Sequence, residues 1–227
     1  DKVFGAPRPK MQSQESQFMA YLVSQAYKPV SKRKDHTIGF TRVQKYDTDQ
    51  IAVWKNDKSG ELTVTVRGTK FLKPNDLLAD AKIIFGKTNS TLPALEKTLS
   101  DIERDHPGQK YNIAAHSLGN AYVFSEMEHR PHWDGVFLFS PPSSPLQSDD
   151  VVSTWANQEG FQYFLNHGDL VSGNFSYFFD QDTLEDQVTY GDYRYDPISS
   201  HSLSQYYPSF IADSDDRPPE YDREDAQ

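Results

Sequence analysis

The sequence joins a buried strand directly to a helix, and this junction restricts the fold more than any other feature. Residues 111 to 115 form a short apolar run that is typical of a strand covered on both faces. After His116 and Ser117, residues 118 to 127 have the apolar spacing of a helix. A strand followed at once by a helix is the unit from which parallel sheets are built, so we expect an α/β fold.

Other segments extend this alternation along the chain. Apolar residues recur every three or four positions over residues 15 to 27, which predicts an amphipathic helix that ends at Pro29. The same spacing from Leu92 to Ile102, with Pro93 in the first turn, predicts a second helix. Strands are predicted at 51 to 56 and 61 to 67, paired as a hairpin, and then within 134 to 142 and 161 to 171.

This order predicts a mainly parallel central sheet with helices on both faces. The 227 residues suffice for one α/β domain and are too few for two typical enzyme domains. We therefore expect a single domain over residues 1 to 212, followed by an acidic, flexible tail over 213 to 227. The tail has seven acidic residues and two arginines, so it carries −5 of the net charge of −10.

Composition excludes several classes of protein. The longest apolar stretches span about five to seven residues, well short of the roughly 20 that a membrane-spanning helix needs. The absence of cysteine excludes disulfides, thiolate metal sites and a cysteine nucleophile, but it leaves the localisation unknown. The sequence begins at Asp1 without an initiator methionine or an apolar signal segment, so we expect a processed or trimmed product.

Charge and spacing also argue against nucleic acid, metals and cofactors as partners. Outside the tail the net charge is −5, and the one basic run, residues 28 to 34, is short and lacks aromatic residues for stacking. No His or carboxylate cluster has the spacing of metal ligands, and no glycine-rich loop suits a phosphate. We expect chemistry that needs no cofactor.

Ser117 lies two residues from Ala115 on one side and from Gly119 on the other. A sharp turn between strand and helix lifts a serine Oγ out of the carboxyl edge of a sheet, and its strained backbone tolerates only small neighbours at these positions. The same turn leaves the backbone N–H of Leu118 at a helix N-terminus, where it can donate to a developing oxyanion. The alternative is that Ser117 only caps the helix.

Four short motifs follow one another over most of residues 15 to 207. They are VRGT (66 to 69) with NDLLADAKI (75 to 83) behind it, AAHSLGN (114 to 120), NHGDLVS (166 to 172) and HSLSQYY (201 to 207). Together they resemble the class-three, fungal-type lipase family of the α/β-hydrolase superfamily, and the resemblance implies an α/β-hydrolase fold. Ala115, Asn120 and Leu170 depart from the family pattern, but none of these changes removes a reacting group.

A serine hydroxyl is a poor nucleophile until an imidazole takes its proton and a carboxylate orients that imidazole. In α/β-hydrolases these groups follow in the order serine, acid, histidine. Asp169 and His201 fit that order behind Ser117, and both follow strands on loops where the carboxyl edge of the sheet would present them. We therefore predict Ser117, Asp169 and His201 as the catalytic residues.

Other residues could fill the same roles. His129 and His132 stand at the end of the predicted helix, where a solvated helix terminus is the simpler interpretation. His167 would need an acid from earlier in the chain. Asp180 and Asp182 are the main rivals of Asp169 as the catalytic acid.

The second oxyanion donor should come from the loop after an earlier central strand. The family resemblance places it at Thr69, whose backbone N–H and hydroxyl could both reach the oxyanion; the alternative is an ordinary turn threonine. We expect Arg67 and Asp80 to brace this loop through a charge-assisted pair. His116 should point away from the serine Oγ and support the turn.

These residues predict a serine carboxylic-ester hydrolase that acts on lipid esters through an acyl-enzyme, as a triacylglycerol or phospholipid lipase does. The expected partners are a lipid or ester substrate and, transiently, a membrane or lipid surface. The resemblance also implies a lid over residues 81 to 93, unless Ile83, Ile84 and Phe85 simply complete a core helix. A short-chain esterase or acyltransferase, and a catalytically silent hydrolase fold that serves as an interaction module, remain as alternatives.

Overall fold

The computed structural model describes residues 13–68, 92–127, 133–141, 149–166, 169, 179–190 and 203–207. Most of the expected lid (residues 81 to 93) and all of the acidic tail (213 to 227) lie outside these residues. The described strands form one eight-stranded sheet whose spatial order is the order of the chain. The strands are β1 (His36–Thr37), β2 (Phe40–Arg42), β3 (Ile51–Asn56), β4 (Leu62–Val66), β5 (Tyr111–His116), β6 (Trp133–Phe139), β7 (Phe161–Leu165) and β8 (Val188–Tyr190).

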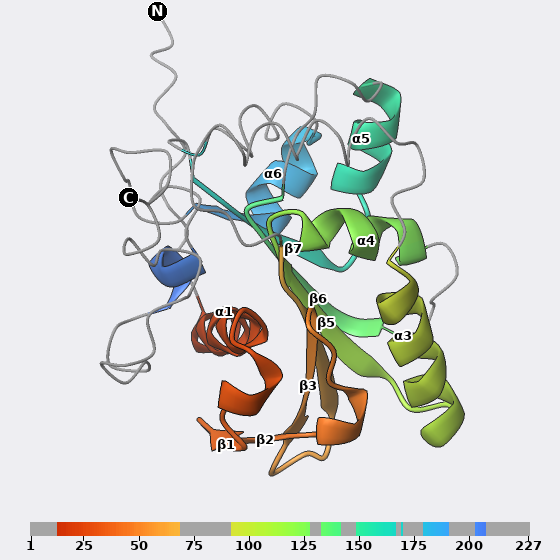
Figure 1. Cartoon of the computed structure of the whole chain (residues 1–227). Coiled ribbons are helices and arrows are strands. Elements are labelled where there is room, and N and C mark those ends of the chain that lie inside the picture. Colours follow the sequence, from red (N-terminus) through yellow and green to blue (C-terminus); the bar gives the residue numbers. More distant parts are fainter. Residues whose placement is uncertain are drawn as a thin grey trace, which may run out of the picture.

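The sheet is antiparallel from β1 to β4 and parallel from β4 to β8. In Figure 1, α1 lies on one side of it, and α3 and α4 lie on the other. The helices are α1 (Gln14–Ala26), α3 (Pro93–Asp105), α4 (Gly119–Glu126), α5 (Asp149–Ala156) and α6 (Gln181–Gln187), with 3₁₀ turns η1 (Val30–Lys32), η2 (Gln44–Tyr46) and η5 (Leu203–Tyr206). The fold class predicted from the sequence is confirmed: it is an α/β-hydrolase fold with a mainly parallel sheet and helices on both faces.

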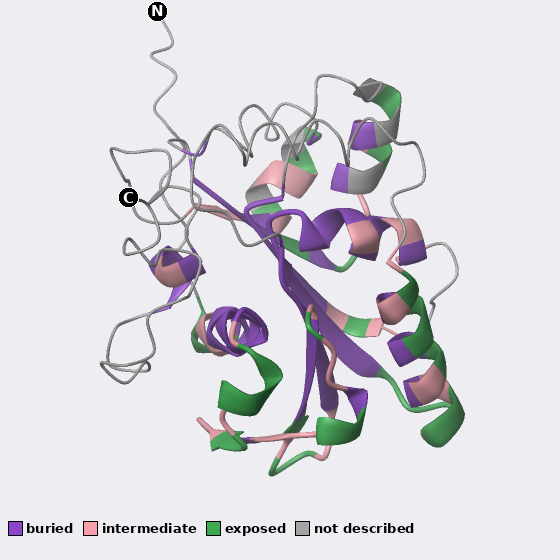
Figure 2. Cartoon of the chain, viewed as in Figure 1, coloured by how far each residue is buried: buried purple, intermediate pink, exposed green. Residues whose placement is uncertain are grey.

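Successive side chains of the central strands pack into two separate hydrophobic cores, one on each face of the sheet. In β6, Val136 and Leu138 join the core under α3 to α6, whereas Phe137 and Phe139 join the core under α1 and η5. Successive side chains of a strand point to opposite faces, so a strand that is apolar throughout must be covered twice. Figure 2 shows the central strands buried along most of their length.

The two helices predicted from apolar spacing are confirmed. Helix α1 begins behind Ser13, whose side chain accepts a hydrogen bond from the Ser16 N–H over 3.1 Å and so caps the first turn. Helix α3 begins with Pro93 in its first turn, where a missing N–H costs nothing. Both helices bury the face on which their apolar residues recur.

The predicted hairpin is also confirmed, because β3 pairs antiparallel with β4 from Ile51 opposite Val66 to Lys55 opposite Leu62. Among the described α-helices and strands, five were not predicted: β1, β2, α5, α6 and β8. No helix in the described ranges is long and apolar enough to cross a membrane.

Candidate active site

Ser117 occupies a sharp turn between β5 and α4. Its φ of 55° lies in the left-handed region, which a residue with a side chain adopts at a cost of about 1–3 kcal/mol. The strand ends at His116 and the helix begins at Gly119, so the turn is only two residues long. The Ser117 N–H donates to the carbonyl oxygen of Phe139 over 3.0 Å, which ties the turn to the end of β6. The local structure is the strand, turn and helix that the sequence predicts.

Two glycines let the end of β4 pass close to this turn. A Cβ at Gly119 would lie 2.6 Å from the carbonyl oxygen of Val66 and 2.8 Å from that of Arg67. A Cβ at Gly68 would lie 2.9 Å from the Cβ of Ser117. No real Cβ approaches other atoms so closely, so both positions require glycine. This contact is the reason why a small residue follows Ser117 at position 119.

Asn120 fixes the turn from inside the helix. Its Nδ2 donates to the carbonyl oxygens of Ser117 and Phe139, each over 2.9 Å. The side chain thereby satisfies two carbonyl groups at the ends of neighbouring strands, while its own Oδ1 is buried without a hydrogen-bond partner. Asn120 is one of the departures from the family pattern, and here its two hydrogen bonds hold the turn in place.

Tyr27, the residue that ends α1, connects the helix to both sides of the serine. Its hydroxyl accepts a hydrogen bond from the Gly68 N–H over 3.0 Å and lies 2.5 Å from Nδ1 of His116. His116 and Ala114 share the face of β5 that α1 covers, and the His116 ring meets that of Tyr27 edge to face. His116 therefore supports the turn from the α1 side, as expected. The part played by Tyr27 was not predicted.

Arg67 braces the segment that leads out of β4. Its Nη2 lies 2.6 Å from Oδ2 of Asp49, and its Nη1 donates to the carbonyl oxygen of Gly68 over 2.6 Å. The guanidinium group thus holds the backbone immediately before Thr69. The sequence led us to expect Asp80 as the partner of Arg67, but Asp80 and Thr69 lie outside the described residues.

Asp169 lies behind the end of β7 and is 1% exposed. Its N–H donates to the carbonyl oxygen of Asn166 over 3.1 Å. The Asn166 side chain in turn donates from Nδ2 to Oε1 of Gln205 over 2.5 Å. The turn that carries Asp169 is therefore bonded to η5, which begins two residues after His201. His201 itself lies outside the described residues.

Tyr206 of η5 connects the ends of β6 and β7. Its hydroxyl donates to the carbonyl oxygen of Phe164 over 3.0 Å, so Ser140 Oγ, 2.8 Å away, is the donor in the second bond. Burial raises the pKa of the Tyr206 hydroxyl, the Ser140 bond lowers it, and the carboxylate of Asp169 raises it further. Asp169 and Tyr206 are thus close enough to interact electrostatically. Ser140, with a φ of 46°, ends β6 much as Ser117 ends β5.

Asp180 and Asp182, the alternative candidates for the catalytic acid, lie at the start of α6. Asp180 caps α6, because its side chain accepts a hydrogen bond from the Thr183 N–H over 2.8 Å, and this bond lowers the pKa of the carboxyl. The Asp180 N–H donates to Asn157 Oδ1 over 2.9 Å, near the point where the chain enters β7. Asp182 is exposed on the first turn of α6. The histidines at 129, 132 and 167 lie outside the described residues.

Nothing in the described part of the chain brings three His, Asp, Glu or Cys side chains together in a way that could hold a metal ion. The groups that the structure does assemble at the carboxyl edge of the sheet are a strained serine, a helix N-terminus at Leu118, and a buried carboxylate. A serine, a helix N-terminus and a carboxylate are types of group that nucleophilic catalysis uses.

No protein-family model matches the sequence, and no curated protein matches it. Solved structures do resemble the chain. The Lip2 lipase of Yarrowia lipolytica has 13% sequence identity and a TM-score of 0.48, over 74% of this chain and 78% of that one. These neighbours are fungal lipases.

Two further fungal lipases extend the comparison. Lipase II of Rhizopus niveus has 16% identity and a TM-score of 0.44, over 70% of this chain and 73% of that one. The lipase of Rhizomucor miehei, in its propeptide complex, has 17% identity and a TM-score of 0.45, over 73% of this chain and 64% of that one. The likeness is one of fold, and function has to be argued from the site.

Proposed function

We propose that the chain is a serine hydrolase that cleaves carboxylic esters of lipids, with Ser117 as the nucleophile. The observation that carries the proposal is the backbone of Ser117, whose φ of 55° places the residue in a strained turn between a buried strand and a helix. Such strain persists only where the surrounding structure enforces it, and it recurs at reacting residues. A serine that merely capped α4 would have an ordinary extended backbone instead.

The proposed reaction has two steps. Ser117 Oγ attacks the ester carbonyl while His201 takes the hydroxyl proton, and the carboxylate of Asp169 stabilises the resulting imidazolium. Collapse of the tetrahedral intermediate breaks the bond to the alcohol, which leaves with the proton from His201. Water then attacks the acyl-enzyme in the same way, releases the fatty acid and restores Ser117.

The bonds around η5 support Asp169 and His201 as partners. Gln205 of η5 is bonded to Asn166, whose carbonyl oxygen also accepts from the Asp169 N–H. His201 precedes Leu203, the first residue of η5, by two positions in the sequence. The bonded contact between η5 and the Asn166 side chain supports the proposed pairing of His201 with Asp169.

The contacts beside Ser117 also support a proposal for the oxyanion donors. Leu118 is the N-cap residue of α4, and the positive end of the helix dipole favours negative charge at its N–H. Thr69 directly follows Gly68, which lies against Ser117 and is held by Tyr27. We propose that the N–H of Leu118 and the N–H and hydroxyl of Thr69 stabilise the oxyanion.

Lipid esters are proposed as substrates because four motifs of the sequence resemble those of the class-three lipases. The chemistry of the site does not by itself distinguish a long acyl chain from a short one, or water from an alcohol as acceptor. The test therefore has to vary both the length of the acyl chain and the acceptor.

Hydrolysis should be followed with p-nitrophenyl esters from acetate to palmitate, and with emulsions of triacylglycerol and of phosphatidylcholine. We expect turnover that favours long acyl chains and falls by roughly 10⁴ to 10⁶-fold in Ser117→Ala. Ser125→Ala is the matched control, because Ser125 lies in the same helix and its hydroxyl donates to the carbonyl oxygen of Tyr122, one turn earlier.

The other possible outcomes of these assays would each indicate a different function. Preference for acetate would identify a short-chain esterase, and ester formation with added alcohols would identify an acyltransferase. Inactivity towards all esters, or full activity of Ser117→Ala, would overturn the proposal and favour a silent fold used for interaction.

A further inference from the structure

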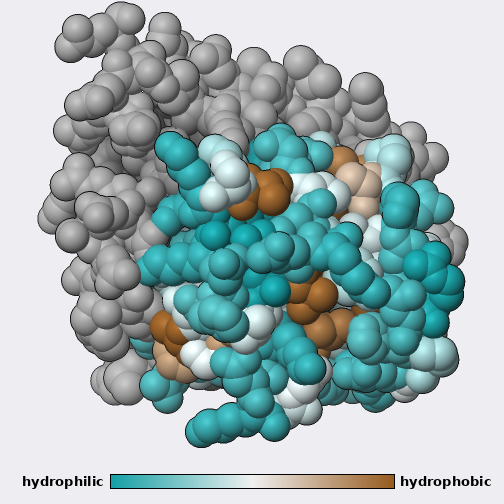
Figure 3. All heavy atoms as spheres, turned by 60° about the horizontal axis from the view of Figure 1, so that its bottom comes forward, coloured by the Kyte–Doolittle hydropathy of each residue, from teal (hydrophilic) through white to brown (hydrophobic). Residues whose placement is uncertain are grey.

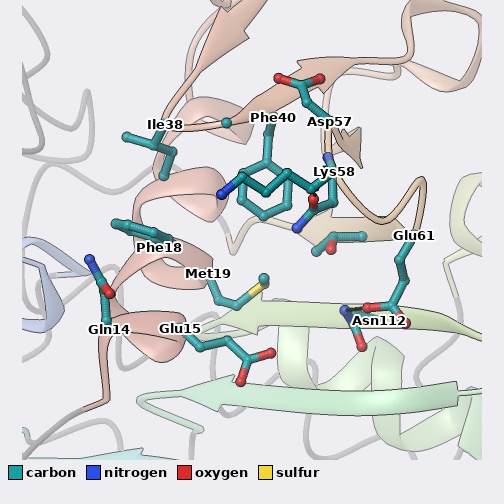
Figure 4. Close-up of a pocket in the computed structure, with 13 residues that line it drawn as sticks. Gln14, Glu15, Phe18, Met19, Ile38, Phe40, Asp57, Lys58, Glu61 and Asn112 are labelled. Carbon is teal, nitrogen blue, oxygen red and sulfur yellow. Dashed lines mark hydrogen bonds between the residues drawn. The ribbon is translucent and has the colours of Figure 1, made fainter.

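A cavity of about 450 Å³ lies at the other end of the central strands from Ser117. It is bordered by the first turns of α1, by β2, by the turn between β3 and β4, and by Asn112 near the start of β5 (Figure 4). Five residues of strand separate Asn112 from Ser117, which corresponds to roughly 16 Å. The cavity is therefore distinct from the proposed active site, and its volume is within the usual range for small-molecule sites.

One wall of the cavity is apolar. In Figure 4, Phe18 and Met19 of α1 lie across from Ile38 and from Phe40 of β2. Met19 and Phe40 belong to the core under α1, while Phe18 and Ile38 pack against it from the surface. Figure 3 shows the molecule turned so that the β1 and β2 end comes forward, and the described surface there is mostly hydrophilic, with hydrophobic residues in separate spots. The apolar wall is thus a local feature of this face.

Carboxylates on α1 and on the β3–β4 side of the cavity supply negative charge. Glu15, Asp57 and Glu61 line the cavity, against one cation, Lys58. In the described part of the chain no lysine, arginine or histidine forms an ion pair with Glu15 or Glu61. Figure 4 shows the Glu15 and Glu61 side chains on either side of Asn112.

Glu61 is held by a fixed hydrogen bond and lies beside other carboxylates. Burial raises its pKa above the ordinary value, the hydrogen bond from Asn112 lowers it, and the nearby carboxylates of Asp134 and Glu15 raise it again. Asn112 donates to Glu61 Oε1 over 2.6 Å and accepts from the Gly135 N–H over 2.8 Å, so its amide is fixed and cannot neutralise the charge. The carboxylate is therefore held in place, partly desolvated and surrounded by like charges.

Thr63 supplies an independent observation. It lines the cavity from β4 and is 1% exposed, yet its hydroxyl has no hydrogen-bond partner. A buried hydroxyl without a partner lacks the hydrogen bond that it makes with water in the unfolded chain, so such groups are uncommon in folded proteins. A ligand that places an N–H at the cavity floor would restore the missing bond.

We propose that this cavity binds a small organic cation, namely a primary ammonium group carried on an aromatic or aliphatic body. The ammonium group binds between Glu15 and Glu61 and donates towards Thr63. The apolar body packs against Phe18, Met19 and Phe40, where the two rings can also interact with the positive charge. An anion would meet three carboxylates, and a fatty acyl chain would bring no positive charge to them.

The test is a titration of the full ¹⁵N-labelled chain at pH 7 with 2-phenylethylammonium, monitored by backbone amide shifts. Phenylacetate, which has nearly the same shape and the opposite charge, is the matched probe. We expect saturable shifts at Lys58, Glu61 and Asn112 with the ammonium probe and none with phenylacetate. Saturation at Leu118 and Gly119 alone, or equal binding of both probes, would contradict the proposal.

Three variants sharpen this result. Glu61→Gln keeps an oxygen that can accept from Asn112 but removes the charge, and it should weaken binding about tenfold or more. Lys58→Gln removes the competing cation and should tighten binding. Glu159→Gln, at an exposed carboxylate ahead of β7, should leave the dissociation constant unchanged. Unchanged affinity in Glu61→Gln would overturn the assignment.

Discussion

A Cβ added at Gly68 would lie 2.9 Å from the Cβ of Ser117, so the end of β4 and the turn after β5 are in direct contact. This contact couples the proposed nucleophile to the segment that leads into the proposed oxyanion loop. A side chain at position 68 could be accommodated only by moving one of them. The end of β4 and the turn at Ser117 can lie this close only because residue 68 has no Cβ.

Gly68→Ala should lower kcat by about tenfold or more, because a misplacement of even 1 Å at a reacting group can cost on the order of 10²-fold. Gly39→Ala is the control. Gly39 has a φ of 85° and no atom within 4 Å of an added Cβ, so the substitution should cost about 1 kcal/mol of stability and leave kcat unchanged. Equal kcat in the parent and in Gly68→Ala would show that the contact has no catalytic importance.

Tyr27→Phe should lower kcat about tenfold with little change in KM, because it releases both Gly68 and His116 from the hydroxyl that joins them. It should also cost about 1–3 kcal/mol of stability, since the Gly68 N–H is left buried without an acceptor. Tyr111→Phe is the matched control. Its hydroxyl bonds to Glu103 and to the Trp133 Nε1 at the other end of β5, so stability should fall while kcat is retained.

Asp169→Asn should reduce turnover on the order of 10²-fold or more, because the amide no longer fixes the tautomer of the catalytic histidine. Asp180→Asn and Asp182→Asn should remain near the parent, since Asp180 caps α6 and Asp182 lies in its first turn. Steady-state rates of all three variants on one ester suffice. A large loss in Asp180→Asn and none in Asp169→Asn would reassign the acid.

The stability of the chain should depend on pH through Glu61. Its pKa is raised above the ordinary value of 4.5 by burial and by neighbouring carboxylates, so the folded state binds the proton more tightly than the unfolded state does. Stability should therefore fall as pH rises from about 4.5 through the folded pKa, and the loss should persist at higher pH.

Glu61→Gln removes this loss and should be more stable than the parent at pH 7.5, by less than about 1 kcal/mol for so accessible a group. The two proteins should converge at pH 4 and below. Urea unfolding at both pH values measures the difference. A variant less stable than the parent at pH 7.5 would mean that the carboxylate already has a partner.

Much of the fold follows from local pattern. Helices α1 and α3, the β3–β4 hairpin and the turn at Ser117 were each predicted because their signals lie within a few residues: apolar period, a proline in the first turn, or small neighbours of the serine. The short strands at the sheet edges were not predicted, because they carry no such local signal. Strands β1, β2 and β8 have two or three residues each, too few to show a period.

The contacts that fix the candidate site were less accessible from the sequence. Tyr27 meets Gly68 41 residues later and His116 89 residues later, and nothing around Tyr27 distinguishes it from another helix-ending aromatic residue. Asn120 was recognised only as a departure from a family pattern. Its bonds to Ser117 and Phe139 depend on the register of β5 and β6, which a single sequence does not specify.

The central claim is that Ser117 is the nucleophile, and covalent labelling tests it most directly. The chain should be treated with a fluorophosphonate probe and digested with trypsin, and the modified residue located by fragment-ion mass spectrometry. We predict modification of Ser117 in the tryptic peptide of residues 111 to 194, since Arg130 precedes a proline and is not cleaved. The modification should be unchanged in Ser125→Ala and absent in Ser117→Ala. Labelling of Ser140, the other serine that ends a central strand with a positive φ, or of no serine at all, would contradict the account.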